Sequence, residues 1–235
     1  MYTYEYPRPS VTVDVVVFGY EGGADLKLLL IQRGSDPFKG HWALPGGFVE
    51  MEEDLETSAL RELEEETGVR DLFVEQLYTY GTPGRDPRGR VISVAYFALV
   101  NLQEHPAVAS SDADDAQWFS VKELPELAFD HADIIARAVD RLRAKVRYQP
   151  VGFELLPSTF TLGQLQQLYE TILDVEEFNK RNFRTRILRT GIIEEVGRQE
   201  NVPHRPAVLY RFVPEKYRAF MEQRDSSVLR RALDF

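Results

Sequence analysis

The segment Gly47–Val69 restricts the fold of this 235-residue chain more than any other part of the sequence. It contains the run RELEEETGV, in which three glutamates recur with the spacing i, i+3 and i+4. A helix places residues with this spacing on one face. These residues are Glu62, Glu65 and Glu66. Like charges crowded on one helix face are unfavourable unless something neutralises them, so the pattern favours a bound cation.

The residue types around this helix indicate which cation and which ligand. Hard cations such as Mg²⁺ or Mn²⁺ prefer oxygen ligands, and they often bind together with diphosphate oxygens. Gly46 and Gly47 precede the helix, and glycine allows the backbone to approach a metal or a phosphate closely. The sequence therefore predicts a helix and loop that bind a divalent metal with a diphosphate.

The spacing of the fixed residues in this segment resembles the signature of the Nudix hydrolases at every position. The resemblance implies an α/β/α sandwich with a mixed sheet, and hydrolysis of a nucleoside diphosphate linked to another group. It implies that the metal ligands are the carbonyl of Gly46 and the carboxylates of Glu62, Glu65 and Glu66. The alternative, a solvated acidic helix face, does not explain a match at every fixed position.

The same resemblance implies a catalytic set around the helix. Arg61 would orient a glutamate by ion pairing, and Glu53 would belong to the same network as the metal ligands. The implied catalytic residues are Glu53, Arg61, Glu62, Glu65 and Glu66. The identity of a single general base varies within the family and stays open at this point.

Apolar periodicity predicts the elements of a first domain, residues 1–150. The expected strands are Val11–Tyr20, Leu26–Gln32, Leu72–Tyr80, Val91–Val100 and Ala116–Val121. A glycine-bearing loop, Leu44–Phe48, is expected before the first of two helices, which are Leu55–Thr67, ended by Gly68, and Ile134–Val146. This order favours a mixed sheet with helices packed on it.

The segment Tyr148–Pro157 contains two prolines and a glycine, so a domain boundary is expected there and residues 151–235 form a second domain. Thr161 and Gln164 form a capping-box signature. The expected helices are Leu162–Leu173, Val175–Arg189 and Glu215–Gln223, and the expected strands are Ile192–Val196 and Ala207–Val213. Two helices followed by a hairpin predict a small winged helix-turn-helix domain.

The charge distribution supports a nucleic-acid function for the second domain although the net charge is −10. Residues 1–153 contain 15 Lys and Arg against 26 Asp and Glu, whereas residues 154–235 contain 13 against 12. Residues 178–211 contain eight basic side chains and three glutamates. A local basic patch on an acidic protein is typical of a surface that meets a phosphate backbone.

The helix expected around residue 183 has apolar residues on one face and basic residues on the other, as a recognition helix does. Phe183 and Ile187 would face the core, and polar side chains would face the DNA groove. The residues predicted to bind DNA are Lys180, Arg181, Asn182, Arg184 and Arg186, with Arg205 from the hairpin loop. The alternative is an ordinary solvated helix with no DNA contact.

An arginine-rich loop in the first domain is a second candidate for ligand binding. Arg85, Arg88 and Arg90 could hold phosphates through paired hydrogen bonds. The loop resembles one shared by ADP-ribose-directed Nudix proteins and Nudix-related regulators. The alternative is an exposed basic loop without a ligand.

The arrangement RNFR-x-R-ILRTG followed by HRPAVLYRF resembles the C-terminal winged helix of Nudix-related transcriptional regulators of NAD metabolism. The resemblance implies that the Nudix domain binds ADP-ribose and that a homodimer binds double-stranded operator DNA, most simply as a repressor. Two alternatives stay open. One is an ADP-ribose pyrophosphatase without a regulatory role, and the other is a sugar-responsive regulator, of the arabinose type, that hydrolyses nothing.

The bulk composition is consistent with a globular protein away from membranes. The apolar stretches are strand-sized, too short to cross a bilayer, and no signal peptide is recognised at the N-terminus. The chain has no cysteine, so disulfides and thiolate metal sites are excluded. A cytoplasmic location is the expectation.

Overall fold

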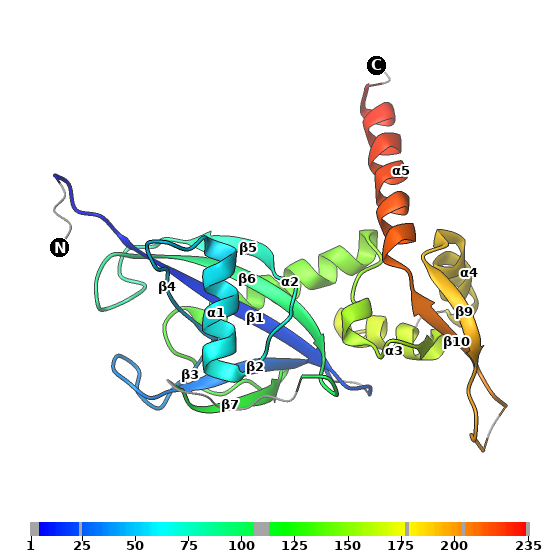
Figure 1. Ribbon diagram of the computed structural model, residues 1–235, viewed down its shortest axis with the longest axis horizontal. Helices are drawn as coiled ribbons and strands as arrows, with labels where there is room; N and C mark the ends of the chain where they lie inside the picture. Colours follow the sequence, from blue (N-terminus) through cyan, green and yellow to red (C-terminus); the bar gives the residue numbers. More distant parts are fainter. Residues whose placement is uncertain (1–4, 24, 106–112, 177–178, 204, 234–235) are drawn as a thin grey trace.

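The fold is taken from a computed structural model that describes residues 5–23, 25–105, 113–176, 179–203 and 205–233. A mixed sheet with a helix on each face forms the first domain, and a small winged helix follows it (Figure 1). The elements predicted for residues 1–150 are present. No helix in the described ranges is long and apolar enough to cross a bilayer.

The sheet of the first domain has seven strands, of which five lie in the order β3-β2-β1-β6-β5, while β4 pairs with β1 and β7 with β2. The pair β1–β6 is parallel and the other pairs are antiparallel, so the sheet is mixed. The strands are β1 Ser10–Tyr20, β2 Lys27–Arg33, β3 Trp42–Ala43, β4 Gly46–Phe48, β5 Glu75–Tyr80, β6 Val91–Asn101 and β7 Ala113–Ser120.

The alternation of side chains along β1 explains why helices cover both faces of the sheet. Val13, Val15 and Val17 point to the face covered by α1 (Leu55–Thr67). Val16 and Phe18 point to the other face, which α2 (His131–Tyr148) covers. Because successive side chains of a strand face opposite sides, one apolar strand supplies two cores. The predicted α/β/α sandwich is confirmed.

Two local predictions for the first domain were wrong. The segment Gly46–Phe48, expected to be a loop, forms β4 and pairs with β1. The predicted strand Leu72–Tyr80 begins only at Glu75, because pairing with β6 starts at Glu75, opposite Phe97.

The second domain contains the predicted winged helix with an additional short strand. Its three-stranded sheet has the order β8-β10-β9, and β8 was not predicted. Its elements are the 3₁₀ turn η1 Phe153–Leu155, β8 Phe160–Thr161, α3 Leu162–Leu173, α4 Lys180–Thr190, β9 Ile193–Arg198, β10 Val208–Phe212 and α5 Pro214–Leu233. The last helix is therefore longer than the predicted Glu215–Gln223.

The boundaries of α3 and α4 follow from their caps. Thr161 and Gln164 form the predicted capping box at the start of α3. The prediction that the next helix begins at Val175 was wrong, because Asp174 ends α3 in left-handed backbone and Asn179 caps the first turn of α4. The side chain of Asn179 accepts a hydrogen bond from the backbone N–H of Asn182 at 3.0 Å.

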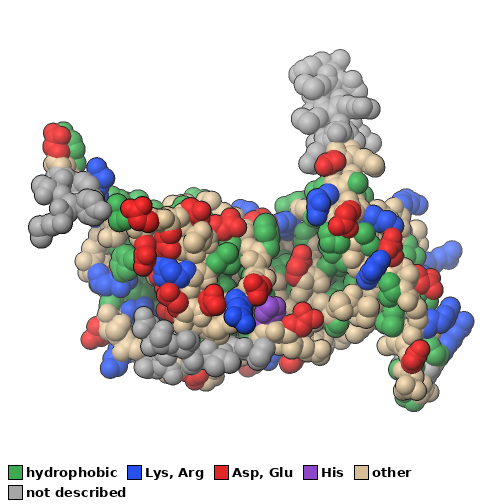
Figure 2. Space-filling view, in the orientation of Figure 1, with side chains coloured by type: hydrophobic (Ala, Val, Ile, Leu, Met, Phe, Trp, Pro, Cys, Tyr) green, Lys and Arg blue, Asp and Glu red, His purple; other side chains and the backbone are tan. Residues whose placement is uncertain are grey.

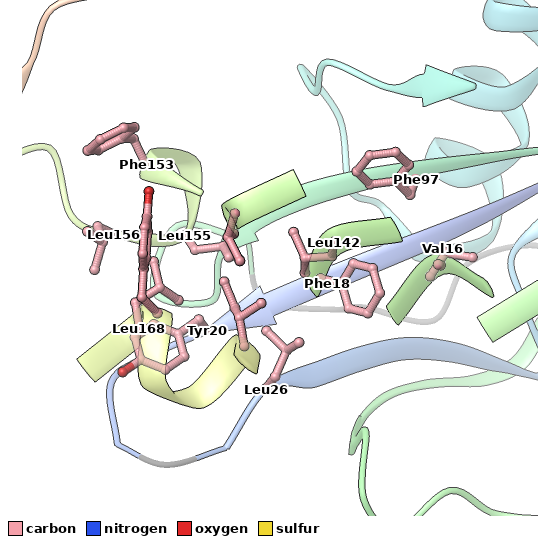
Figure 3. Close-up of a cluster of buried hydrophobic side chains, with 14 of the residues drawn as sticks. Val16, Phe18, Tyr20, Leu26, Phe97, Leu142, Phe153, Leu155, Leu156 and Leu168 are labelled. Atoms are coloured by element: carbon pink, nitrogen blue, oxygen red, sulfur yellow. The ribbon is translucent and has the colours of Figure 1, made fainter. Parts of the chain in front are cut away.

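One hydrophobic core extends from the sheet into the winged helix. Figure 3 shows Tyr20 of β1, Leu155 of η1 and Leu168 of α3 gathered in this core. All three are buried, together with Leu142 of α2. The two domains are therefore packed against each other through apolar side chains.

Candidate functional site

The local sequence around α1 fixes where its glutamates lie. Asp54 accepts a hydrogen bond from the N–H of Thr57 at 2.8 Å and begins the helix, and Gly68 ends it in left-handed backbone. Ala59 and Leu63 are buried against β1, so the opposite side of α1 is left for charged residues. Acidic side chains gather over this helix in Figure 2.

Arg61 connects the acidic residues of the site. Its guanidinium is 2.6 Å from the Oε1 of Glu53, 2.9 Å from the Oε1 of Glu62 and 3.1 Å from the Oε2 of Glu65. Hydrogen bonds from Arg61 and from the backbone N–H of Glu50 lower the pKa of Glu53 to about 2. The role that the resemblance gives to Arg61, orienting glutamates, is compatible with these contacts.

Glu66 has the most unusual environment of the three helix glutamates. Its Oε2 accepts a hydrogen bond from the backbone N–H of Gly46 at 2.8 Å. Burial raises the pKa of Glu66 to about 8, and the nearby carboxylates of Glu62 and Asp14 act in the same direction. Burial also raises the pKa of Glu62. Neighbouring buried carboxylates are costly without a compensating positive charge, which suits a divalent cation.

The glycines of β4 also fit a metal and phosphate site. A Cβ atom on Gly47 would lie 2.4 Å from the carboxylate of Glu62, and one on Gly46 would lie 2.1 Å from the carbonyl oxygen of Val13. Glycine at position 46 therefore allows this strand to lie close to β1, and glycine at position 47 leaves room for the carboxylate of Glu62. In the described ranges no three acidic or histidine side chains form a metal site by themselves, and Glu65 is half exposed in its pair with Arg61. Oxygens from a ligand would have to complete the coordination.

An open cavity of about 420 Å³ lies beside these glutamates. Both carboxylates and guanidinium groups line it; its charged lining includes Arg33, Arg61, Glu62, Glu66 and Arg88. A smaller cavity of about 80 Å³ continues past Arg33 and Arg88. Phe129, Asp14 and His131 line this second cavity.

Arg33 and Arg88 approach each other over the ring of Phe129. Their guanidinium carbons lie 4.8 Å and 5.5 Å from the centroid of that ring, and Arg88 also lies 5.0 Å from the ring of Phe48. Burial lowers the pKa of Arg33, and the neighbouring charge of Arg88 lowers it further. Two cations held together at a cavity wall favour an anionic ligand such as a diphosphate.

Of the three arginines predicted from the loop sequence, Arg85 and Arg88 line the smaller cavity, whereas Arg90 lines neither cavity. Arg85 is buried and donates two hydrogen bonds to Asp130, and it lies 3.6 Å from Asp14. Arg90 donates to the carbonyl of Gly81 at 2.7 Å. Of the three, Arg88 alone lines the cavity beside the glutamates, although Asp86 also accepts hydrogen bonds from it.

His131, which belongs to none of the sequence motifs, lines the smaller cavity. Its Nδ1 accepts a hydrogen bond from the N–H of Leu44 at 2.9 Å, and its Nε2 is 3.5 Å from Asp14. Burial lowers the pKa of His131, so the ring is neutral near pH 7. The hydroxyl of Ser93 donates to the same aspartate. These contacts fix the chain that leads into Gly46.

The predicted recognition helix α4 divides into faces as expected. Ile187 is buried, and Phe183 is partly buried with its ring 5.6 Å from that of Tyr169. The helical spacing places Arg181 and Arg184 on the exposed side. Basic side chains line the outer edge of this domain in Figure 2.

The remaining predicted DNA contacts have different positions. Asn182 and Arg186 line an apolar groove between α4 and the end of α2, so they lie on a flank of the helix. Lys180 is exposed in the first turn, and Arg205 is exposed in the loop between β9 and β10. All six residues are exposed, and two of them, Asn182 and Arg186, also line the groove.

Comparison with known proteins decides the family. Residues 8–138 match the NUDIX domain, and residues 152–212 match the NrtR DNA-binding winged helix domain. The chain is 40% identical over 217 residues to the ADPR responsive transcriptional repressor NtrR of Acinetobacter baylyi, an alignment that covers 91% of this chain and 86% of the relative. This chain belongs to the NrtR family.

Other members and relatives of the NrtR and Nudix families support both domains. The structure of Shewanella oneidensis NrtR complexed with a 27mer DNA has a TM-score of 0.79 and 36% identity, and covers 88% of this chain and 95% of that one. The NUDIX domain of the same protein, complexed with ADP ribose, has a TM-score of 0.55 and 39% identity over 58% of this chain and 90% of that one. The ADP-ribose pyrophosphatase of Methanocaldococcus jannaschii is 43% identical over 130 residues, 55% of this chain and 73% of the relative.

Proposed function

We propose that this NrtR-family protein is a DNA-binding repressor that responds to ADP-ribose. The observation that carries the proposal is the cavity lined both by glutamates of α1 and by the guanidinium groups of Arg33 and Arg88, in a chain that also presents a basic helix α4. The names of the Acinetobacter and Shewanella relatives, which include ADPR and a DNA complex, agree with both halves of this proposal.

The diphosphate of ADP-ribose is assigned to the space between the glutamates and the arginine pair. Arg33 and Arg88 would hold its oxygens through charge-assisted hydrogen bonds, and the rings of Phe48 and Phe129 behind them would hold the guanidinium groups in place. The assignment retains Arg88 from the predicted loop and adds Arg33. Arg85 would act indirectly, by keeping Asp130 in position.

We also propose that the Nudix domain binds Mg²⁺ or Mn²⁺ and hydrolyses ADP-ribose. The carboxylates of Glu62, Glu65 and Glu66 and the carbonyl of Gly46 would hold the cation. When bound, the cation would lower the pKa of a water and offset the charge of the diphosphate. Arg61 would keep the carboxylate of Glu53 beside this site, and Glu66 would stay aligned through the N–H of Gly46.

Operator binding is assigned to the exposed side of α4 and the hairpin loop. Arg181 and Arg184 would meet the DNA groove or its phosphates, and Arg205 would meet the phosphates beside it. The homodimer stays a prediction. A two-fold symmetric operator would place one α4 in each half-site, so the operator sequence itself will show whether two copies bind.

Titration of DNA binding with ADP-ribose tests the regulatory half of the proposal. The probe is a duplex selected from a random-sequence library by binding to this protein. Saturating ADP-ribose should weaken binding by about fivefold or more, the usual range for coupled sites. A non-hydrolysable analogue serves as the control against loss of effector. The sugar-responsive alternative predicts a different result. In that case the DNA dissociation constant would stay unchanged with both compounds and would change with arabinose.

Release of AMP from ADP-ribose tests the enzymatic half. With Mg²⁺ or Mn²⁺ the protein should release AMP, and Glu66→Gln should abolish release while circular dichroism shows an intact fold. If the protein releases AMP but enriches no DNA sequence from the random library, it is a hydrolase with no regulatory role. Absence of AMP with either metal would show that the site binds the nucleotide without cleaving it.

A further inference from the structure

The end of α3 is attached to the first domain by charged side chains. The Nε of Arg143, on α2, donates a hydrogen bond to the carbonyl of Ile172 at 3.1 Å. Asp174 accepts a hydrogen bond from the Nζ of Lys122 at 2.6 Å and lies 3.8 Å from the Nη2 of Arg143. The side chains of Lys122, Arg143 and Asp174 are here called the interdomain clamp.

A neutral hydrogen bond lies beside the clamp. The hydroxyl of Thr171 shares its proton between the carbonyl of Gly23, in the turn between β1 and β2, at 3.1 Å and the carbonyl of Gln167 in its own helix at 2.9 Å. Thr171, Ile172 and Asp174 are thus all held by the first domain. The last turn of α3 exposes carbonyl groups that have no partner within the helix, which explains why a guanidinium binds there.

The position of Asp174 gives the clamp an influence on α4. This residue ends α3 in left-handed backbone with φ 54°, and the chain then leads to Asn179, the cap of α4. The hydrogen bond from Lys122 lowers the pKa of Asp174, and Arg143 lowers it further, so the carboxylate is charged near pH 7. The clamp therefore holds the C-terminal end of α3, the helix that precedes α4.

The same helix that carries Arg143 begins at the ligand cavity. His131 is the first residue of α2 and lines the smaller cavity, and Asp130 before it binds Arg85. A helix rises 1.5 Å per residue, so about 18 Å separate His131 from Arg143. One helix thus connects Arg85 and His131, which line the smaller cavity, to the clamp.

The exposure of the clamp distinguishes it from the apolar contacts between the domains. The side chains of Lys122 and Asp174 are 58% and 52% exposed, whereas Leu155 and Leu168 are completely buried. An exposed ion pair contributes little to stability and is weakened by salt. The clamp can rearrange while the buried contacts hold the domains together.

We propose that Lys122, Arg143 and Asp174 are positioning residues for the recognition helix, and that they transmit occupancy of the ligand cavity to α4. The second part of this proposal, that the clamp transmits ligand occupancy, rests on the proposed response to ADP-ribose. The first part, that the clamp positions the recognition helix, does not. A ligand that moves the start of α2 changes the contacts of Arg143 at the other end, and thereby the orientation of α4.

A matched pair of substitutions separates positioning from stability. Asp174→Asn removes the charge of the clamp, and asparagine tolerates left-handed backbone. Asp71→Asn is the control, because Asp71 is also left-handed with φ 61° and is paired with a neighbouring arginine in the first domain. Both variants should melt close to the wild-type temperature.

The first readout needs no ligand. Because the chain has no cysteine, spin labels can be placed at Gln76→Cys on β5 and Glu195→Cys on β9, both exposed. Asp174→Asn should shift or broaden the distance distribution between the labels, and Asp71→Asn should not. An unchanged distribution in Asp174→Asn overturns the positioning role, whatever the protein does with ADP-ribose.

The second readout is the ratio of the DNA dissociation constants with and without ADP-ribose, measured on the selected duplex. Asp174→Asn and Lys122→Gln should each reduce this ratio by about threefold or more, and the double variant should reduce it no further. If both single variants keep the wild-type ratio of dissociation constants, the clamp does not transmit ligand occupancy to α4. A wild-type protein that itself shows no response contradicts the proposed function instead, and the label distances still decide the positioning.

Discussion

Arg33 and Arg88 are the residues on which the ligand assignment depends most. Arg33→Ala and Arg88→Ala should each weaken ADP-ribose binding about 10- to 100-fold, because each removes hydrogen bonds to a charged group, about 1.5–3 kcal/mol. Isothermal titration calorimetry without added metal measures the effect. Arg90→Ala provides the comparison, since Arg90 donates to the carbonyl of Gly81. An equal loss in Arg90→Ala would show that the whole loop binds the ligand.

The acidic residues of the site could be predicted from sequence, whereas Arg33 could not. Glu62 and Glu66 lie on one helix, where spacing alone determines the shared face. Arg33 ends β2 and reaches the site only because β2 and β4 both pair with β1. Nothing in the sequence around Arg33 indicates that pairing. The burial of Arg85 beside Asp130 likewise depends on contacts between distant segments.

At the scale of the element, α4 shows which part of a recognition helix a sequence can predict. The buried positions Phe183 and Ile187 follow from apolar spacing. The start of the helix does not, because the left-handed backbone of Asp174 and the cap at Asn179 depend on local geometry. Nor does the sequence show that Arg186 borders a groove, since that groove is formed by α2 and α5.

These two sides of α4 should differ in their effect on DNA binding. The double variant Arg181→Ala, Arg184→Ala should weaken binding to the selected duplex at least about tenfold. If both residues contact phosphates, the slope of log K for DNA binding against log salt concentration should become shallower by about two. The matched double variant Asn182→Ala, Arg186→Ala should have a smaller effect. Fluorescence anisotropy at several salt concentrations provides the comparison, and the reverse order of effects would place the DNA on the other flank.

At the scale of the whole molecule, the continuous core couples the unfolding of the two domains. Leu155 is completely buried between β1, α3 and the rest of that core. Leu155→Ala should therefore cost about 2–5 kcal/mol, as large-to-small substitutions in a core do. Leu188→Ala on α4 is the control, because Leu188 is 39% exposed and surface changes usually cost under about 0.5 kcal/mol.

Calorimetry should show a single unfolding transition in the wild type, with equal calorimetric and van't Hoff enthalpies. In Leu155→Ala that one transition should move to lower temperature as a whole. Two separate transitions in the wild type would mean that the shared core does not couple the domains. The sequence predicted a boundary between residues 148 and 157, but it gave no indication that apolar packing continues across it.

The strand β1 determines what kind of motion can connect the ligand to the DNA. It carries Asp14 at the cavity and Tyr20 in the shared core, and six residues of extended chain span about 20 Å. Parallel pairing with β6 runs the whole length of the strand, from Ser10 to Tyr20, so β1 can neither stretch nor slide. The length of β1 between the cavity and the shared core is therefore fixed, and a rotation of the winged helix about its base leaves that length unchanged. Because the β9–β10 hairpin projects away from the first domain (Figure 1), a given tilt displaces its tip farther than residues near that base.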